Sequence, residues 1–334
     1  YSWNGSFWIN ETMFADQSDT DNTYDIARFG DTIIVVWGRS SSLLVPYYRI
    51  SRDGGTTWSS ETTIDSSTYA KFAYHSGLDF EFLSDGTGLL LYKHGDGATG
   101  WIWSFWNGSV FSESGVLDAT DSGQHAKASI AALENGGAFV VRRNSDMTAV
   151  YLNKWNGTSF ESRVTLDSSS YGYPGGPEIE CNIYGNCLMV HRASDGDLEY
   201  MRYNGSSWSA QDVDVDGAST WSINFENSVI GLAMDDYNNS VLVWYSSNRL
   251  ETRWANYSWE QNSWIYQGVL GVPHPSSSYG DGVQVGLKMP FDEAPIVVNI
   301  TERGDYNSID PLDPLTIEAY VYDQESNFNL GVLE

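Results

Sequence analysis

The chain has 334 residues and a formal net charge of −27, and 41% of its residues are hydrophobic and 14% aromatic. This composition supports a large folded core and excludes global disorder, and the length allows two domains or one large all-β domain. The acidic balance argues against nucleic-acid binding, which needs a basic face, and no apolar run reaches the ~18 residues of a membrane span. Because the chain opens at Tyr1 without an initiator methionine, we expect a processed chain or a piece of a longer protein.

The first 22 residues contain a single hairpin signal, the segment Asn4-Gly-Ser-Phe-Trp8. Asn-Gly is a strong signal for a tight turn because both residues tolerate a positive φ. We therefore expect residues 1–22 to form a partial blade hairpin or the end of a preceding segment. Residues 23–334 are expected to form the main domain.

A second hairpin is predicted at Ser51–Trp58, where the sequence reads Ser-x-Asp-x-Gly-x-x-Trp. A run rich in β-forming residues, Leu44–Ile50, leads into this segment. Asp53 can bond its own backbone, the paired glycines accept a positive φ, and Trp58 can pack over the turn. The pattern is typical of a tight turn between two antiparallel strands.

The same pattern, a turn residue followed four positions later by an aromatic residue, recurs along the whole chain. Successive aromatic residues are 50, 53, 49, 48, 56 and 64 positions apart. These seven aromatic residues are Trp8, Trp58, Phe111, Phe160, Trp208, Trp264 and Phe328. Such a period indicates a repeated structural unit.

Further strand-like runs precede six of the turns, and none of them shows a helical period. The runs expected to form second strands are Thr32–Trp37, Gly88–Tyr92, Ala138–Val141, Cys187–Val190, Ser240–Trp244 and Pro295–Ile300. Each unit then contains four short strands, which is the content of one β-propeller blade. We predict an all-β, six-bladed β-propeller of four-stranded antiparallel blades. Seven blades are the alternative, because residues 1–22 add one more hairpin.

Cys181 and Cys187, the only cysteines, flank a predicted turn. A disulfide across this hairpin is the expectation for a protein outside the cytosol, and two buried thiols are the alternative.

Alternating acids occur at Asp212, Asp214 and Asp216, as in a calcium-binding loop. Calcium is the one cofactor that the sequence suggests. The glutamate that closes such a loop is missing, because position 223 is Ile. The alternative is a strand with its valines turned inward and its acids in water.

Two stretches resemble those of sialidases and related Asp-box (BNR-repeat) propellers. The segment Asp31–Arg39, followed by Tyr47–Trp58, resembles a sialidase strand that ends in Gly-Arg and the first Asp-box after it. Leu188–Arg192 is similar to the strand that delivers another sialidase arginine. The resemblance implies a propeller whose Asp-boxes lie at the outer hairpins of the blades.

The sialidase catalytic set is not recognisable in the chain. Asp25 stands where the resemblance would place an arginine that binds the substrate carboxylate, and Ser40–Leu43 contains no catalytic acid. Glu178 is displaced by two residues from the expected glutamate, and Tyr279 is the only tolerable match for the nucleophile. A retaining glycosidase needs an acid/base and a nucleophile that face one bond, so we expect no sialidase activity.

Basic residues follow the predicted second strands. The candidate ligand-binding residues are Arg39, Lys93, His94, Arg142, Arg143, His191, Arg192, Arg249 and Arg303. In a propeller these corners would surround the mouth of the central channel, where guanidinium groups suit a carboxylate or sulfate. The alternative is local neutralisation by Asp96, Asp146, Asp195 and Asp197 in the same loops.

Eight Asn-x-Ser/Thr sequons predict glycosylation of an exported chain, although four of them coincide with the repeated turn. They begin at Asn4, Asn10, Asn107, Asn156, Asn204, Asn238, Asn256 and Asn299.

These features favour a non-catalytic, extracellular or cell-surface propeller for adhesion, glycan recognition or surface assembly. The expected partners are acidic glycans or neighbouring copies of the protein, without nucleic acid or membrane insertion. One alternative is a sialidase-like glycoside hydrolase or a lyase with a divergent site. Another is a structural subunit of a surface layer, filament or viral appendage.

Overall fold

The protein is described here by a computed structural model. It covers residues 2–3, 8–9, 21–39, 46–64, 78–93, 100–118, 128–144, 148–168, 176–193, 198–209, 213–215, 230–236, 238–246, 251–273, 317–323 and 326–333. All regular structure in these ranges is β-strand, arranged as five four-stranded antiparallel sheets and two hairpins. Nowhere in the described part of the chain is there a helix with the length and hydropathy of a membrane span. The chain divides into two compact units, Tyr1–Ala126 and Lys127–Glu334, which are described separately.

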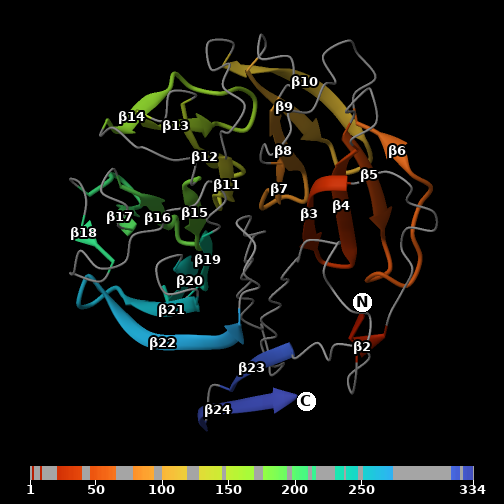
Figure 1. Ribbon diagram of the computed structural model, residues 1–334. Coiled ribbons are helices and arrows are strands. Elements are labelled where there is room, and N and C mark those ends of the chain that lie inside the picture. The colour runs from red at the N-terminus through yellow and green to blue at the C-terminus, as the bar shows by residue number, and fades with distance from the viewer. Residues whose placement is uncertain are drawn as a thin grey trace. The chain divides into compact units, whose positions relative to one another are not determined.

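The first unit contains two complete sheets and one short hairpin (Figure 1). The hairpin pairs β1 (Ser2–Trp3) with β2 (Trp8–Ile9). The first sheet consists of β3 (Asp21–Phe29), β4 (Thr32–Arg39), β5 (Pro46–Ser51) and β6 (Thr62–Thr63). The second sheet consists of β7 (Leu78–Phe82), β8 (Gly88–Lys93), β9 (Trp101–Trp106) and β10 (Phe111–Asp118).

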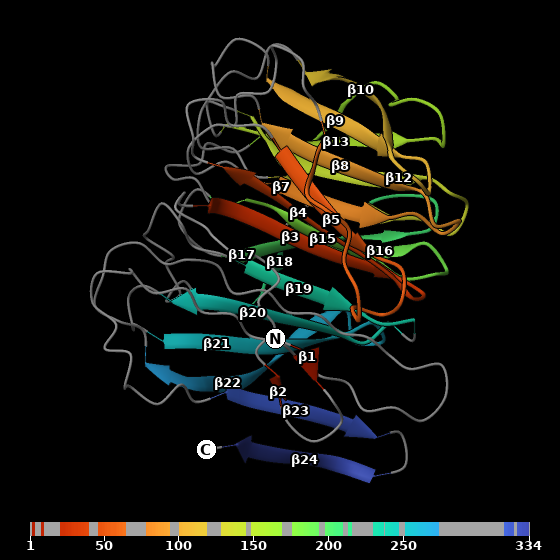
Figure 2. The same cartoon turned by 90° about the vertical axis from the view of Figure 1, so that its right-hand side faces the viewer.

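The second unit contains three complete sheets and a hairpin. The third sheet consists of β11 (Ala128–Ala132), β12 (Ala138–Arg143), β13 (Val150–Trp155) and β14 (Val164–Asp167). The fourth consists of β15 (Glu178–Cys181), β16 (Asn186–Arg192), β17 (Leu198–Asn204) and β18 (Val213–Asp214). The fifth consists of β19 (Ile230–Met234), β20 (Ser240–Ser246), β21 (Glu251–Ser258) and β22 (Ser263–Pro273), of which β20, β21 and β22 lie side by side in Figure 2. The hairpin pairs β23 (Ile317–Asp323) with β24 (Ser326–Leu333).

Each sheet is a simple meander, since consecutive strands are hydrogen-bonded neighbours in the order of the chain. The predicted fold class is confirmed at this level. The predicted second strand at Pro295–Ile300 lies outside the described residues, and the boundary at residue 22 stays a prediction.

The repeated Asn-Gly turns have one common geometry. In the hairpins that begin at Asn107, Asn156 and Asn204, the asparagine Oδ1 accepts hydrogen bonds from the backbone N–H groups two and three residues later. The following glycines, at positions 108, 157 and 205, have φ angles of 91°, 97° and 86°. A residue with a Cβ rarely adopts such angles, so the Asn-Gly pair is what the turn requires.

The aromatic residue after each turn occupies a matching place on the outer strand. Phe160 pairs with Trp155 and Trp208 pairs with Tyr203. The backbone bond from Ser209 N to Arg202 O, one residue beyond Trp208, has its counterpart in the bond from Ser59 N to Ile50 O beyond Trp58. Trp208 also packs against Phe139 of the preceding sheet, with 5.7 Å between ring centroids. Trp208 therefore lies between neighbouring sheets, as the repeat predicted for this residue.

The Ser51–Trp58 turn is fixed by its aspartate. Asp53 Oδ1 accepts hydrogen bonds from the Ser51 hydroxyl and from the Thr57 amide, each at 2.8 Å, and Oδ2 accepts one from the Thr57 hydroxyl at 2.6 Å. The bonds from Thr57 and Ser51 lower the pKa of Asp53 to about 2. Trp58 closes the turn by donating its indole N–H to the Gly55 carbonyl.

Neighbouring sheets bury apolar side chains between them, and the β-strand alternation decides which sheet each side chain meets. In the fourth sheet, Cys187 and Met189 pack toward the third sheet, whereas Leu188 and Val190 pack toward the fifth. All six residues of β12 are buried, because both faces of this strand are covered. Within each unit, neighbouring sheets thus share a core.

Carboxyl groups lie at the junction of the two inner strands β3 and β7. Asp25 Oδ2 accepts a hydrogen bond from Phe80 N at 2.7 Å, and Oδ1 accepts one from Ile26 N. Burial raises the pKa of Asp25 despite these bonds and a further one to Asp79. Burial and the nearby charge of Asp25 raise the pKa of Glu81 to about 8.

We predict that the stability of the protein falls as pH rises from about 5 to 8, partly because of Glu81. The folded state retains the Glu81 proton up to pH about 8, whereas the unfolded chain releases it near 4.5, so the folded state binds more protons in this window. The Glu81→Gln substitution removes this difference and should raise the melting temperature at pH 8 by a few degrees. Thermal unfolding followed by circular dichroism at pH 5 and pH 8 measures the effect.

The matched control is Glu134→Gln, which changes an exposed turn residue. An equal change of the pH dependence in both variants would attribute the effect to overall charge and contradict the role of Glu81.

Candidate functional site

The observed registers define which ends of the second strands are equivalent. Lys93, Arg143 and Arg192 each pair with the first residue of the third strand in their sheet, and Gly38 does so in the first sheet. Arg39 follows this position by one residue, as His94 follows Lys93 in the sequence. The side chains of Arg39 and Lys93, and all of His94, Arg249 and Arg303, lie outside the described structure.

The four candidate residues whose side chains are described are buried. The exposed fractions are 0% for Arg142, 1% for Arg143, 0% for His191 and 4% for Arg192. These groups therefore lie within the protein instead of forming an open basic ring. Since a buried charge needs polar or charged neighbours, their surroundings decide what they can do.

Arg142 belongs to a stack with an aromatic ring on the third sheet. The Arg142 guanidinium carbon lies 5.1 Å from the centroid of the Tyr151 ring, and the Arg163 guanidinium carbon lies 4.4 Å from it. Arg142 also donates a hydrogen bond from Nε to Asn153 Oδ1 at 3.3 Å. Arg163 is exposed and Tyr151 is partly buried, so the outer part of this stack reaches solvent.

Arg143 points from the opposite face of β12, between the third and fourth sheets. Its Nη2 group donates a hydrogen bond to the Arg192 carbonyl oxygen. Burial, with the positive charge of Arg192, lowers the pKa of Arg143 to about 9, and the charge of Asp167 opposes this shift. Arg143 is thus a buried cation that faces a buried carboxylate.

Next to it, three side chains from the third and fourth sheets converge. His191 Nε2 lies 3.9 Å from Asp167 Oδ2 and 3.8 Å from Glu199 Oε2. The ligand atoms of all three residues lie within 4.8 Å of one another. His191 and Asp167 are fully buried, and Glu199 is partly so. We call this group the Asp-His-Glu cluster.

Sequence reasoning identified His191 but missed Asp167 and Glu199. Glu199 lies opposite His191 in the register of β16 and β17, which the strand pattern would have revealed once the strand ends were aligned. Asp167 comes from the outer strand of the neighbouring sheet, and only the packing of two sheets brings it to His191.

The predicted calcium loop is largely outside the described residues, which include neither Asp212 nor Asp216. The backbone of Asp214 pairs with that of Glu199, so this loop begins beside the Asp-His-Glu cluster in the register of the fourth sheet. Calcium binding by the loop stays a prediction.

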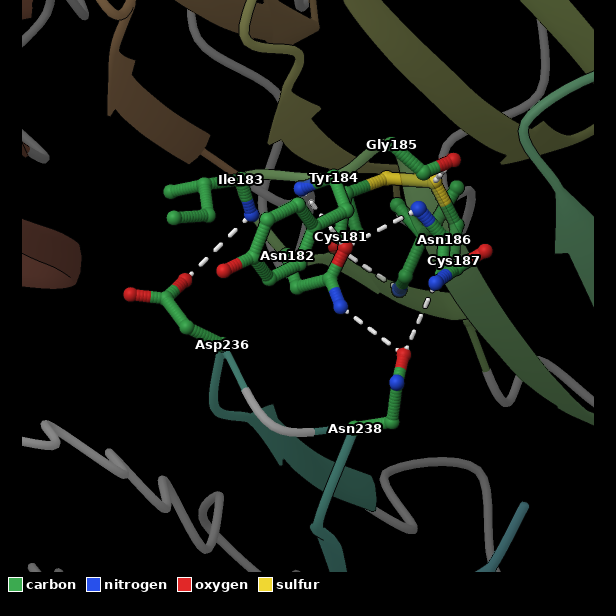
Figure 3. Close-up of a disulfide and its surroundings, with 11 residues drawn as sticks. Cys181, Asn182, Ile183, Tyr184, Gly185, Asn186, Cys187, Asp236 and Asn238 are labelled. Atoms are coloured by element: carbon green, nitrogen blue, oxygen red, sulfur yellow. Dashed lines mark hydrogen bonds between the residues drawn. A yellow bond between two sulfur atoms is a disulfide. The ribbon is translucent and has the colours of Figure 1, made fainter. Parts of the chain in front are cut away.

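Cys181 and Cys187 are joined by a disulfide, which closes the turn between β15 and β16 (Figure 3). Asn238, on the corresponding turn of the fifth sheet, accepts hydrogen bonds at Oδ1 from the amide groups of Asn182 and Asn186, at 2.8 and 2.9 Å. The Ile183 N–H group donates to Asp236. The disulfide turn therefore connects two neighbouring sheets.

The sequons fall into two structural classes. Asn107, Asn156 and Asn204 are exposed at hairpin turns, where a glycan would extend into solvent. Asn238 is engaged by the disulfide turn, and Asn256 lies within β21, between strands β20 and β22. Asn4, Asn10 and Asn299 lie outside the described residues.

No protein-family model matches the chain, and the search of curated proteins gave no significant match. The similarities found are to solved structures, and those described below have low sequence identity.

Three of these structures illustrate the similarity. AofleA from Arthrobotrys oligospora is 10% identical, with a TM-score of 0.58 over 93% of this chain and 86% of that chain. The lectin of Aleuria aurantia, described as a six-bladed β-propeller, is 13% identical, with a TM-score of 0.54 over 95% of this chain and 96% of that chain. A leech intramolecular trans-sialidase is 11% identical, with a TM-score of 0.58 over 89% of this chain and 68% of that chain.

At these identities the likeness establishes the fold and leaves activity open. The similar structures include a trans-sialidase, so the sialidase-like propeller expected from the sequence is supported at the level of fold. Together with the four-stranded antiparallel meanders, the comparisons identify the chain as an all-β protein with the six-bladed β-propeller fold.

Proposed function

We propose that the protein is a non-catalytic, extracellular glycan-recognition module. Its fold is similar to that of the fucose-specific lectin of Aleuria aurantia and of the SapL1 lectin, which was solved with α-methyl fucoside. The turn at Ser51–Trp58 is in this proposal an Asp-box, whose bonds hold the hairpin and leave recognition to other residues.

The observation that carries the proposal is the Arg142–Tyr151–Arg163 stack. Guanidinium groups bind carboxylate and sulfate groups through paired hydrogen bonds, and the Tyr151 ring, which both guanidinium groups contact, holds them in position. Asn153 and Tyr151 hold Arg142 in place, whereas Arg163 is exposed and can meet a ligand. On a protein with a net charge of −27, such a local positive site would favour acidic glycans over neutral ones.

A glycan array with fucosylated, sialylated and sulfated glycans tests the proposal. We expect the wild type to bind acidic glycans and Arg163→Ala to bind them at least about tenfold more weakly, because one charge-assisted contact is lost. Tyr151→Ala should have a similar effect. The expected result also includes weaker binding at high salt, since exposed charges are screened.

The matched control is Arg52→Ala, since Arg52 is an exposed arginine that donates to the Gly108 carbonyl oxygen, remote in sequence from the stack. Equal loss in Arg52→Ala and Arg163→Ala would indicate unspecific charge attraction. If the wild type binds no glycan on the array, the proposal is wrong, and surface assembly between copies becomes the better explanation.

The proposal includes the absence of sialidase chemistry. The Asp25 carboxyl group accepts hydrogen bonds from Phe80 and Ile26, so it serves to connect β3 with β7. A carboxyl group here would repel the carboxylate of a sialic acid, because like charges oppose each other. We expect no release of sialic acid from a model glycoside; release that is abolished in Tyr279→Phe would overturn this expectation.

An extracellular location is proposed from the disulfide and the exposed sequons. Mass analysis of material from the native source should find glycans at Asn107, Asn156 or Asn204, and none at Asn238 or Asn256. A glycan attaches to the asparagine Nδ2 and needs space around the side chain. Asn238 is partly buried against the disulfide turn and Asn256 is partly buried within β21, whereas Asn107, Asn156 and Asn204 are exposed. Unmodified protein with both cysteines reduced would contradict the proposed location.

A further inference from the structure

The Asp-His-Glu cluster has the geometry of a cation site. Hydrogen bonds between nitrogen and oxygen are about 2.7–3.2 Å long, so the separations of 3.9 and 3.8 Å between His191 Nε2 and the two carboxylates are too long for direct bonds. With the third separation below 4.8 Å, a point equidistant from the three atoms lies about 2.0–2.5 Å from each. This range is the length of a bond between a metal ion and a nitrogen or oxygen ligand.

The histidine is oriented as a metal ligand would be. His191 Nδ1 lies 3.3 Å from the Arg192 carbonyl oxygen, which can accept a hydrogen bond but cannot donate one. A proton on Nδ1 leaves the lone pair of Nε2 directed at the two carboxylates. Histidine ligands of metal sites are commonly held by such a bond to a backbone carbonyl.

We propose that Asp167, His191 and Glu199 bind one divalent transition-metal ion between the third and fourth sheets, with Zn²⁺ as the best-matched ion. Imidazole nitrogen suits Zn²⁺ better than Ca²⁺, which prefers an all-oxygen shell. His191 and Asp167 are fully buried, so a single ion fits this position better than a sugar does. The ion would connect β14 with β16 and β17, and this site is independent of the proposed glycan site on the opposite face of β12.

Positively charged side chains of the protein would compete with the metal ion for the carboxylates of Asp167 and Glu199. Arg143 interacts electrostatically with Asp167, and a protonated His191 would also attract both carboxylates. Removing the Arg143 charge should therefore strengthen metal binding, whereas it should weaken a cluster held together by ion pairs alone. This opposite effect separates the two explanations.

The test is a titration of the full chain, freed of metal with a chelator, with Zn²⁺ in competition with a chromophoric indicator. We expect one site whose affinity falls at least about tenfold in His191→Gln and in Glu199→Gln, and rises in Arg143→Gln. Titration with Co²⁺ should give visible absorption bands that His191→Gln removes. The control is Glu161→Gln, an exposed acid of the same unit, which should bind like the wild type.

Circular dichroism identifies variants that fail to fold. If His191→Gln does not fold, Glu199→Gln alone decides, because Glu199 is partly exposed. The proposal is wrong if the wild type binds no Zn²⁺, or if folded His191→Gln or Glu199→Gln binds it as tightly as the wild type. A negative result for the metal site would not change the result expected from the glycan array, so the two proposals can fail separately.

Discussion

Within each unit, neighbouring sheets of this protein cover one another's apolar faces. A four-stranded meander of short strands cannot bury enough apolar surface alone, so each sheet depends on the next one. This requirement explains why β12 is buried along its whole length and why side chains of β16 alternate between two different cores. Polar and charged side chains lie at the strand ends, beyond the apolar cores. The Asp-His-Glu cluster and the Arg142–Tyr151–Arg163 stack are found there.

The sequence predicted the repeat well because the turn chemistry is local. An asparagine followed by glycine sets the hairpin, and the aromatic residue four positions on, such as Phe160 or Trp208, packs at a fixed place relative to it. Strand identity and the approximate strand ends followed from these markers. The exact strand ends did not, since β4 extends to Arg39, two residues beyond the predicted end at Trp37.

The sites were predicted less well, because they depend on contacts between sheets. Arg142, Arg143 and His191 were found as basic residues at strand ends, but their burial could not be read from a pattern of bases. Asp167 reaches His191 from a different sheet, 24 positions earlier in the chain. The effect of Asp25 on the pKa of Glu81 likewise requires two inner strands to lie together.

The disulfide turn has a consequence for how the chain folds. Cys181 and Cys187 are six positions apart, so their bond closes a short local loop and does not have to wait for distant segments to meet. No other cysteine exists in the chain, so incorrect intramolecular pairing is not available. The closed turn holds Asn182 and Asn186 close together, so one oxygen of Asn238 can accept a hydrogen bond from each of them, and the local disulfide also supports the contact between the fourth and fifth sheets.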